Sequence, residues 1–238
     1  MEIKVLGCST SWSELPNSSY CINGKILIDC GGATNKRLEA NGIKMEDIEH
    51  IFITHFHSDH FFGIIEYLNF AIHYAKERKK LTIYGPLGLI ERINVILKYF
   101  IMPRKEVDVF EFVNLIEIKD ENVEFFIDSI KIKPYRLNHN NVFDYGYILQ
   151  SETKTVGFSG DCILDESLEK FVSRCDVAFV DCCSRVSSQN HNGVDGYHKL
   201  KDKYPKCDLI AVHCTSDVYA NSEELNVKKA KPNTIYLI

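Results

Sequence analysis

The stretch IFITHFHSDHFFGI constrains the fold more than any other part of the chain. Its first residues form an apolar run of the kind that predicts a buried strand. Three histidines and an aspartate follow within six residues: His55, His57, Asp59 and His60. Side chains at alternate positions of an extended segment point the same way, so His55 and His57 can bind one ion together. Asp59 and His60, beyond the turn, suit a second ion.

Imidazole and carboxylate groups are ligands that zinc, manganese and iron accept. The alternative is a polar loop in which histidines cluster by chance. We disfavour it because the chain has only nine histidines and places three of them directly after a buried strand. The pattern therefore predicts a metal site.

Three more candidate ligands follow predicted strands later in the chain. His139 comes just after an alternating strand, and His213 follows the apolar run LIAV. Asp161 follows the apolar run VGF, with Gly160 permitting a tight turn. Because a strand end can hold a ligand rigidly, we expect these side chains to complete a binuclear site.

Strands and hairpins are numerous, and helices separate them. The dipeptide Asn23-Gly24 predicts a hairpin turn, and the apolar spacing predicts helices over residues 63–80 and 222–230. This mixture indicates an α+β sandwich of sheets covered by helices rather than one doubly wound sheet. No Pro- or Gly-rich linker divides the chain, so we expect a single domain over residues 1–238.

Composition narrows the functional classes. No apolar run approaches the ~20 residues of a membrane-spanning helix, and no secretory signal is visible, so we expect a cytoplasmic protein. The net charge is −5, which disfavours nucleic acid as a partner. The densest basic stretch, Lys76–Lys80, is interpreted as a solvated helix C-terminus. The nine cysteines contain no C-x-x-C pair and are expected to be reduced.

Four features occur in a fixed order along the chain: the motif H-x-H-x-D-H, a later lone histidine, an aspartate in SGD and a final histidine after a strand. In type and order they resemble the metallo-β-lactamase superfamily, in its phosphodiesterase and nuclease branch, over essentially the whole chain. The resemblance implies a four-layer αββα sandwich. It also implies two divalent metal ions, zinc with manganese as the alternative, and a bridging hydroxide as the nucleophile.

The resemblance divides the ligands between the two ions and makes Asp161 the bridge. The first ion would be bound by His55, His57 and His139. The second would be bound by Asp59, His60 and His213.

Two relatives within this branch compete: ribonuclease Z, and the cyclic-phosphate phosphodiesterase of phosphonate catabolism. Asp181 occupies the position of a glutamate in ribonuclease Z, and His191 matches its later histidine. The pattern VDCCS…NH looks more like the phosphodiesterase. An acid–histidine pair can protonate a leaving oxygen; the alternative is that both residues only orient the ligands. We assign Asp59, Asp181 and His191 as catalytic residues.

The segment from His139 to Asp161 suits a hairpin and leaves no room for the tRNA-binding arm that bacterial ribonuclease Z carries there. The phosphonate-pathway enzyme has a cysteine cluster for a structural zinc, whereas the corresponding loop here has only Cys8 and Cys21. We therefore expect a metal-dependent hydrolase, a phosphodiesterase for small or cyclic phosphodiesters. The alternatives are ribonuclease Z-like RNA 3′ processing and a metal-binding protein without turnover. Thioesters and lactones are further possible substrates. Homodimers are common among such relatives, so we expect that this chain can form one.

Several other residues lie close to the predicted site residues or could contact a substrate. Trp12 either stacks on a base or sugar of a substrate or caps the core. Asp29 either orients a metal ligand or ends a strand. Cysteines beside the site residues are expected to pack in the core: Cys162, Cys182, Cys183 and Cys214.

Overall fold

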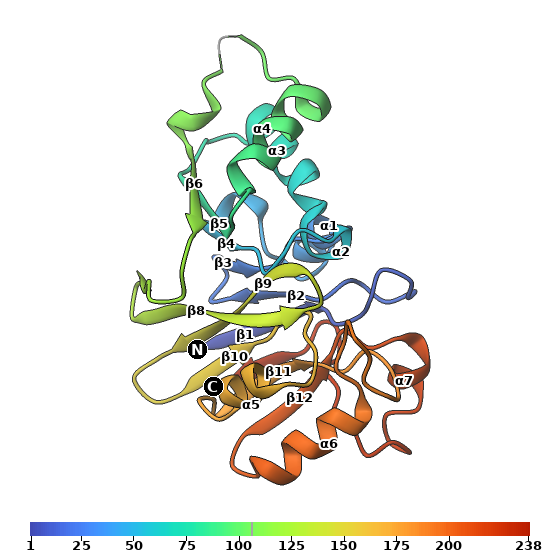
Figure 1. The fold of residues 1–238 in the computed structure, drawn as a ribbon. Coiled ribbons are helices and arrows are strands. Elements are labelled where there is room, and N and C mark those ends of the chain that lie inside the picture. Colours follow the sequence, from blue (N-terminus) through green and yellow to red (C-terminus); the bar gives the residue numbers. More distant parts are fainter. Residues whose placement is uncertain (106) are drawn as a thin grey trace.

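The computed structural model describes residues 1–105 and 107–238, and two β-sheets packed face to face form its centre (Figure 1). The first sheet has seven strands in the order β13-β1-β2-β3-β4-β5-β6. Their bounds are β1 Glu2–Gly7, β2 Ser19–Ile22, β3 Ile26–Ile28, β4 His50–Phe52, β5 Leu81–Pro86, β6 Val113–Ile118 and β13 Ile235–Leu237. The predicted hairpin joins β2 to β3, with Asn23 and Gly24 at positive φ.

The second sheet has six strands in the order β12-β11-β10-β9-β8-β7. Their bounds are β7 Phe125–Ile127, β8 Ile130–His139, β9 Val142–Gln150, β10 Thr155–Phe158, β11 Val177–Asp181 and β12 Asp208–Val212. Strands β7 to β10 form an antiparallel meander, and β10, β11 and β12 run parallel.

Helices cover the outer face of each sheet. Apolar side chains of α1, α3 and α4 pack on the first sheet, and those of α5 and α6 pack on the second (Figure 1). The helices are α1 Thr34–Ala40, α2 Ser58–Phe61, α3 Gly63–His73, α4 Leu89–Ile96, α5 Glu166–Val172, α6 Val194–Lys203 and α7 Ser216–Ala220. Short helical turns add η1 Met45–Asp47, η2 Leu97–Ile101 and η3 Val109–Glu111. The α+β class and the four-layer αββα order are thereby confirmed.

Aromatic side chains fill the space between the two sheets. Phe52 of β4 stacks on Tyr84 of β5 with ring centroids 4.1 Å apart, and Phe158 of β10 stacks on Phe179 of β11 at 5.0 Å. Tyr20 of β2 contacts Phe158 across the interface at 4.7 Å. Burying each such side chain contributes about 1.5–3 kcal/mol, so this layer fixes one sheet against the other.

This packing brings the carboxyl ends of several strands to one edge. Strands β3 and β4 run parallel in the first sheet, as do β10, β11 and β12 in the second. Strand β8 runs in the same direction as β10 because both are antiparallel to β9. The loops that leave these ends therefore meet at one edge of the sandwich.

Two predicted helices were wrong in extent or place. Helix α3 ends at His73, so Lys76–Lys80 is not its C-terminus; there Arg78 lies over the Phe112 ring and Lys79 pairs with Asp47. Residues 222–226 form turns and Lys229 forms an isolated bridge with Ala211, because Asn226 has a φ of 51°, which a helix cannot continue through. A short helix, α7, lies just before them.

Candidate dimetal site

The ligand loop leaves β4 and becomes α2 within a few residues. His57 is the extended N-cap residue of α2, and Asp59 and His60 lie buried in its only turn. The loop after β3 packs directly on this turn: the amide of Cys30 donates to the carbonyl of His60 at 2.8 Å. A Cβ atom on Gly31 would lie 1.7 Å from the Asp59 carbonyl oxygen. Only glycine permits this close approach.

We predict that Gly31→Ala destabilises the fold by about 1–3 kcal/mol or more, because the backbone of α2 must move away from the new methyl group. Thermal unfolding measures the effect. Gly32→Ala is the matched control, since the nearest atom to its Cβ is Asn17 Oδ1 at 3.6 Å. Equal stability of the two variants would contradict the predicted clash.

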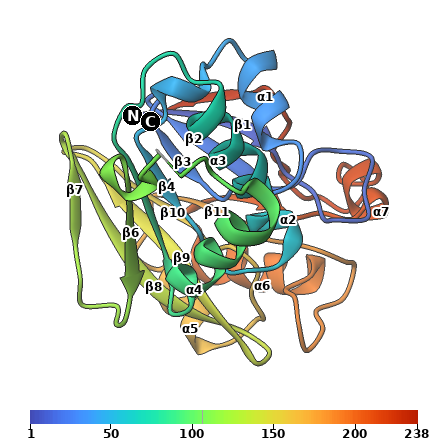
Figure 2. The same ribbon diagram turned by 90° about the horizontal axis from the view of Figure 1, so that it is seen from above.

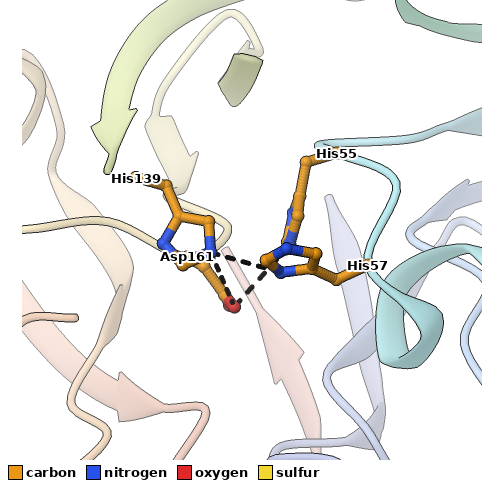
Figure 3. A group of neighbouring side chains, drawn as sticks. All are labelled: His55, His57, His139 and Asp161. Carbon is orange, nitrogen blue, oxygen red and sulfur yellow. Dashed lines mark hydrogen bonds and ion pairs between the residues drawn. The ribbon is translucent and has the colours of Figure 1, made fainter. Parts of the chain in front are cut away.

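The first cluster combines two histidines of the loop after β4 with two residues at strand ends of the second sheet. The donor atoms of His55, His57, His139 and Asp161 all lie within 4.8 Å of one another, and their side chains point toward a common centre (Figure 3). His139 Nε2 lies 3.2 Å from His57 Nδ1, and His55 Nε2 lies 3.7 Å from Asp161 Oδ2. The other ring nitrogen of His139 donates to the carbonyl of Asn190 at 2.6 Å. This bond leaves the Nε2 lone pair directed into the cluster.

A second cluster contains Asp59, His60 and His213, whose donor atoms also lie within 4.8 Å of one another. His213 Nε2 lies 3.2 Å from Asp59 Oδ2 and 3.3 Å from Asp161 Oδ1. His60 Nε2 lies 3.1 Å from the same Asp161 oxygen. Asp161 therefore faces the first cluster with Oδ2 and the second with Oδ1.

The donor atoms of the two clusters fit metal ions. His55 Nε2, His60 Nε2 and Asp161 Oδ1 are buried and make no hydrogen bond to any described residue. Buried polar atoms without a partner are costly, and a divalent ion satisfies such atoms directly. Imidazole with carboxylate is a donor set that zinc and manganese accept.

The pKa shifts in the site also indicate that it favours bound positive charge. Burial alone would raise the pKa of Asp161, but the charges of His213 and His60 hold it well below its usual range. Burial would likewise lower the pKa of His60 and of His213, and the Asp161 carboxylate raises both well above the usual value. Metal binding releases such protons and replaces their charge.

Asp29 organises ligands of both clusters. His60 Nδ1 donates to Asp29 Oδ2 at 2.7 Å, and the Thr54 amide donates to Oδ1 at 2.8 Å. The Thr54 hydroxyl donates to Oδ2 at 3.0 Å and lies 3.0 Å from His55 Nδ1, from which it can accept. Asp29 has a φ of 59°, an unfavourable left-handed conformation that these bonds maintain. Of the two alternatives for Asp29, the geometry favours orientation of ligands.

We predict that Asp29→Asn weakens metal binding about 10–100-fold, because asparagine has one acceptor oxygen and cannot accept from His60 and from the Thr54 backbone amide at the same time. Titration with a chelator of known affinity measures the loss. The control is Asp47→Asn, a half-exposed carboxylate that pairs with Lys79. Unchanged affinity in Asp29→Asn would show that the ligands keep their orientation without this carboxylate.

Asp144 is a buried carboxylate of β9 that the sequence did not single out. It is fully buried, and Oδ1 lies 3.8 Å from His55 Nδ1. Burial, with the nearby charges of Asp161 and Asp29, raises its pKa well above the usual value. Because it follows no strand end, its position gave no signal of proximity to the site.

Asp181 and His191 lie together beside the second cluster. Strand β11 ends at Asp181, which is fully buried, and His191 Nδ1 donates to its Oδ2 at 2.9 Å. Burial alone would lower the pKa of His191, but the hydrogen bond and charge of Asp181 raise it. The other carboxylate oxygen lies 3.7 Å from His213 Nδ1. The pair therefore presents a protonatable imidazole next to the ligands.

A cavity of about 340 Å³ opens over the site. Its lining includes His57, Asp59, Asp161, His191 and His213. The other lining residues are an indole, a thiol and five hydroxyl-bearing residues: Trp12, Cys183, Thr10, Ser11, Ser58, Thr215 and Ser216. The two threonines lie in loops that are far apart in the chain, so local sequence gave no signal that they share a cavity.

Cys183 differs from the other cysteines near the site. Cys162, Cys182 and Cys214 are buried in the core between the second sheet and its helices, as expected. Cys183 is half-buried, and its sulfur lies within 4.8 Å of donor atoms of His191 and His213. The expectation of core packing was wrong for Cys183, because the chain leaves β11 at Asp181 and no longer alternates between faces.

The two helix-covered sheets, with the His/Asp clusters at their edge, are those of a metallo-β-lactamase fold. Residues 1–229 match the family model described as anti-Pycsar protein Apyc1. The chain belongs to this family. No helix among residues 1–105 and 107–238 is long and apolar enough to cross a membrane.

Relatives and solved structures agree with this class. Ribonuclease Z of Oceanobacillus iheyensis is 27% identical over 150 residues, 63% of this chain and 46% of the relative. The metallo-β-lactamase fold protein YhfI from Bacillus subtilis superposes with a TM-score of 0.80 at 19% identity, covering 99% of both chains. A diphosphatase from the PhnP family gives 0.80 at 17% identity, covering 100% of this chain and 97% of that one. The chain spans about half the length, or less, of the curated relatives it matches.

Proposed function

We propose that this chain is a dimetal phosphodiesterase that hydrolyses small or cyclic phosphodiesters. The observation that carries the proposal is the lining of the 340 Å³ cavity: metal-ligand candidates, His191 and five hydroxyl-bearing residues, with no lysine or arginine among the described lining residues. A long RNA needs many cationic contacts to its phosphates. A small diester needs only the charge of two metal ions.

The short segment between His139 and Asp161 supports a small substrate. His139 ends β8, and only β9, β10 and their turn lie between it and Asp161. The bacterial ribonuclease Z arm described above would occupy this place. A second candidate is ribonuclease Z-like cleavage of RNA 3′ trailers, favoured by the 27% identity to ribonuclease Z.

In this proposal the residues have distinct roles. His55, His57 and His139 would hold one ion, and Asp59, His60 and His213 would hold the other, with Asp161 facing both clusters. Bound divalent ions lower the pKa of water toward neutrality and offset the charge of a phosphodiester.

His191 acts on the leaving group in this proposal. Its Nδ1 is engaged by Asp181, which leaves Nε2 as the nitrogen available to the substrate. Water attacks phosphorus and loses a proton to solvent, the bond from phosphorus to the leaving oxygen breaks, and His191 donates a proton to that oxygen and is reprotonated from solvent. Asp181 keeps the imidazole oriented and protonated.

The test is hydrolysis of bis-p-nitrophenyl phosphate by protein with counted metal ions, with and without a chelator. The proposal requires two ions per chain and turnover that the chelator abolishes. A panel of cyclic nucleotides, cyclic sugar phosphates and precursor tRNA then separates the candidates. Cleavage of precursor tRNA alone would favour the ribonuclease candidate. Two ions without hydrolysis of any ester, thioester or lactone would leave a metal-binding protein without turnover.

Four other expectations from the sequence stay predictions. They are a single hydrolase unit over residues 1–238, zinc rather than manganese, a homodimer and a cytoplasmic location. Metal analysis, light scattering and cell fractionation measure the last three.

A further inference from the structure

Cys183 is the one cysteine of the chain that is not buried. The structure describes all nine cysteines, and the other eight are buried. Cys183 lines the cavity over the clusters, and its sulfur lies within 4.8 Å of a donor atom of His191 and of a donor atom of His213. The donors of the two His/Asp clusters include no sulfur. The two clusters therefore leave this thiol without a role.

Backbone hydrogen bonds position Cys183 and His191. The Cys183 amide donates to the carbonyl of Asn192 at 2.9 Å, and the Thr215 amide donates to the carbonyl of Cys183 at 2.9 Å. Asn192 directly follows His191, whose amide donates to Ser188 Oγ at 3.1 Å. The helices into which these loops lead, α6 and α7, lie with α2 on the side of the molecule away from β7 (Figure 2). The backbone thus holds the thiol and the imidazole near each other.

Two buried polar atoms near Cys183 make no hydrogen bond to any described residue. They are Asp181 Oδ1 and His213 Nδ1, and the 3.7 Å between them is too long for a hydrogen bond. Asp181 is fully buried and His213 is 4% exposed. The partner atoms of each group are already engaged, since Asp181 Oδ2 accepts from His191 and His213 Nε2 faces Asp59. Because buried polar atoms without a partner are costly, they indicate a ligand at this end of the cavity.

A thiol, an imidazole and a carboxylate are donors that suit a soft divalent cation. Thiolate sulfur favours soft cations such as zinc and cadmium over magnesium and calcium. The thiol loses its proton to solvent as the bond to the metal forms. The thiolate and the Asp181 carboxylate then offset the charge of the cation. No lysine or arginine is among the described lining residues, and Arg185, two residues after Cys183, pairs with Asp217.

We infer that Cys183 and His191, with Asp181, form a third cation site that binds cadmium, or zinc in excess of the two ions of the clusters, and that zinc bound there inhibits the enzyme. Asp181 engages Nδ1 of His191, so Nε2 is the nitrogen that a cation takes. A carboxylate commonly orients a metal-bound histidine in this way. A cation on Nε2 replaces the proton that the acid role requires. The inhibition rests on the proposed function, whereas the cation site does not.

A cadmium titration tests the site directly. A cadmium–thiolate bond gives a charge-transfer absorption in the ultraviolet, which bonds to nitrogen and oxygen do not give. Wild-type protein with its first two ions counted is titrated with cadmium chloride, and we expect a saturable absorption that corresponds to one thiolate per chain. Cadmium that replaces an ion in either cluster adds no such signal, because those donors include no sulfur. Absence of the absorption would overturn the inference.

Two cysteine variants form the matched pair for this titration. Cys183→Ser is expected to lose the absorption and to bind the third cation about 10–100-fold more weakly, since loss of a partner that orients a ligand already has an effect of that size. Cys207→Ser, which changes a buried cysteine outside the cavity lining, should keep the absorption. A circular dichroism spectrum checks the fold of both. Equal signals in the two variants would assign the absorption to another thiol and overturn the inference.

Inhibition by zinc is measured with 3′,5′-cyclic AMP, because its leaving oxygen needs a proton. Excess zinc is expected to lower the initial rate of the two-ion enzyme about tenfold or more, and a weak chelator should restore it. Relative to its own rate without excess zinc, Cys183→Ser should need about 10–100-fold more zinc for half inhibition. Cys207→Ser should need the same concentration as the wild type.

The outcomes separate the inference from the function on which the inhibition rests. Cadmium–thiolate absorption at Cys183 without zinc inhibition of an active enzyme overturns the inhibitory role. Absence of hydrolysis of every phosphodiester by the two-ion protein overturns the proposed function and the inhibition together. In that case the cadmium titration of the wild type and of Cys183→Ser still confirms or overturns the third cation site.

Discussion

Replacing Asp161 with alanine is expected to lower metal content below two ions per chain and to reduce phosphodiesterase activity by about 10³-fold or more. The reason is its position: Oδ1 lies near His60 and His213 of one cluster, and Oδ2 lies near His55 of the other. Without this carboxylate the crowded imidazoles lose the charge that favours a cation between them. Metal analysis by mass spectrometry and initial rates on bis-p-nitrophenyl phosphate measure the two effects.

The control for Asp161→Ala is Asp202→Ala, which removes an exposed carboxylate from α6. It should keep two ions and full activity. A far-ultraviolet circular dichroism spectrum distinguishes loss of metal from loss of fold. Full metal content and full activity in Asp161→Ala would show that this carboxylate is not shared between two ions.

Replacing His191 with alanine is expected to have an effect that depends on the leaving group. A general acid accelerates expulsion of a strongly basic alkoxide by about 10²–10⁴-fold, whereas p-nitrophenolate leaves readily without a proton. His191→Ala should therefore lose about 100-fold or more on a cyclic nucleotide and far less on bis-p-nitrophenyl phosphate. Equal losses on both substrates would contradict the acid role. His73→Ala, an exposed histidine at the end of α3, is the control.

The acid role of His191 also predicts how activity changes with pH. Asp181 raises the pKa of His191, and a general acid works only while it is protonated. Activity should therefore fall as the pH rises through that pKa. Asp181→Asn removes the negative charge, lowers the pKa of His191 and moves the alkaline limb of the kcat/KM profile to lower pH. A limb that stays in place in Asp181→Asn would assign it to another group.

Some features of this protein follow from local sequence alone. The donor residues could be identified because each lies at or just after the end of a predicted strand, as His213 follows β12, or stands in the dense motif after β4. The hairpin at Asn23-Gly24 was equally local, since those residues accept positive φ. The sequence did not predict where α3 ends. The helix stops at His73, and beyond it Arg78 and Lys79 contact Phe112 and Asp47.

The sequence by itself predicted an α+β sandwich and the candidate donors, because periodicity, turn chemistry and ligand spacing act over a few residues. The four-layer αββα order came from the resemblance of its motifs to a known superfamily. The tertiary structure alone decided which loops surround those donors. Trp12, Cys183 and Thr215 come together because parallel strands end at one edge and carry distant loops with them. Asp29 gains its role only where the ends of β3 and β4 meet. Such proximity depends on strand order and sheet packing, and no short stretch of sequence encodes it.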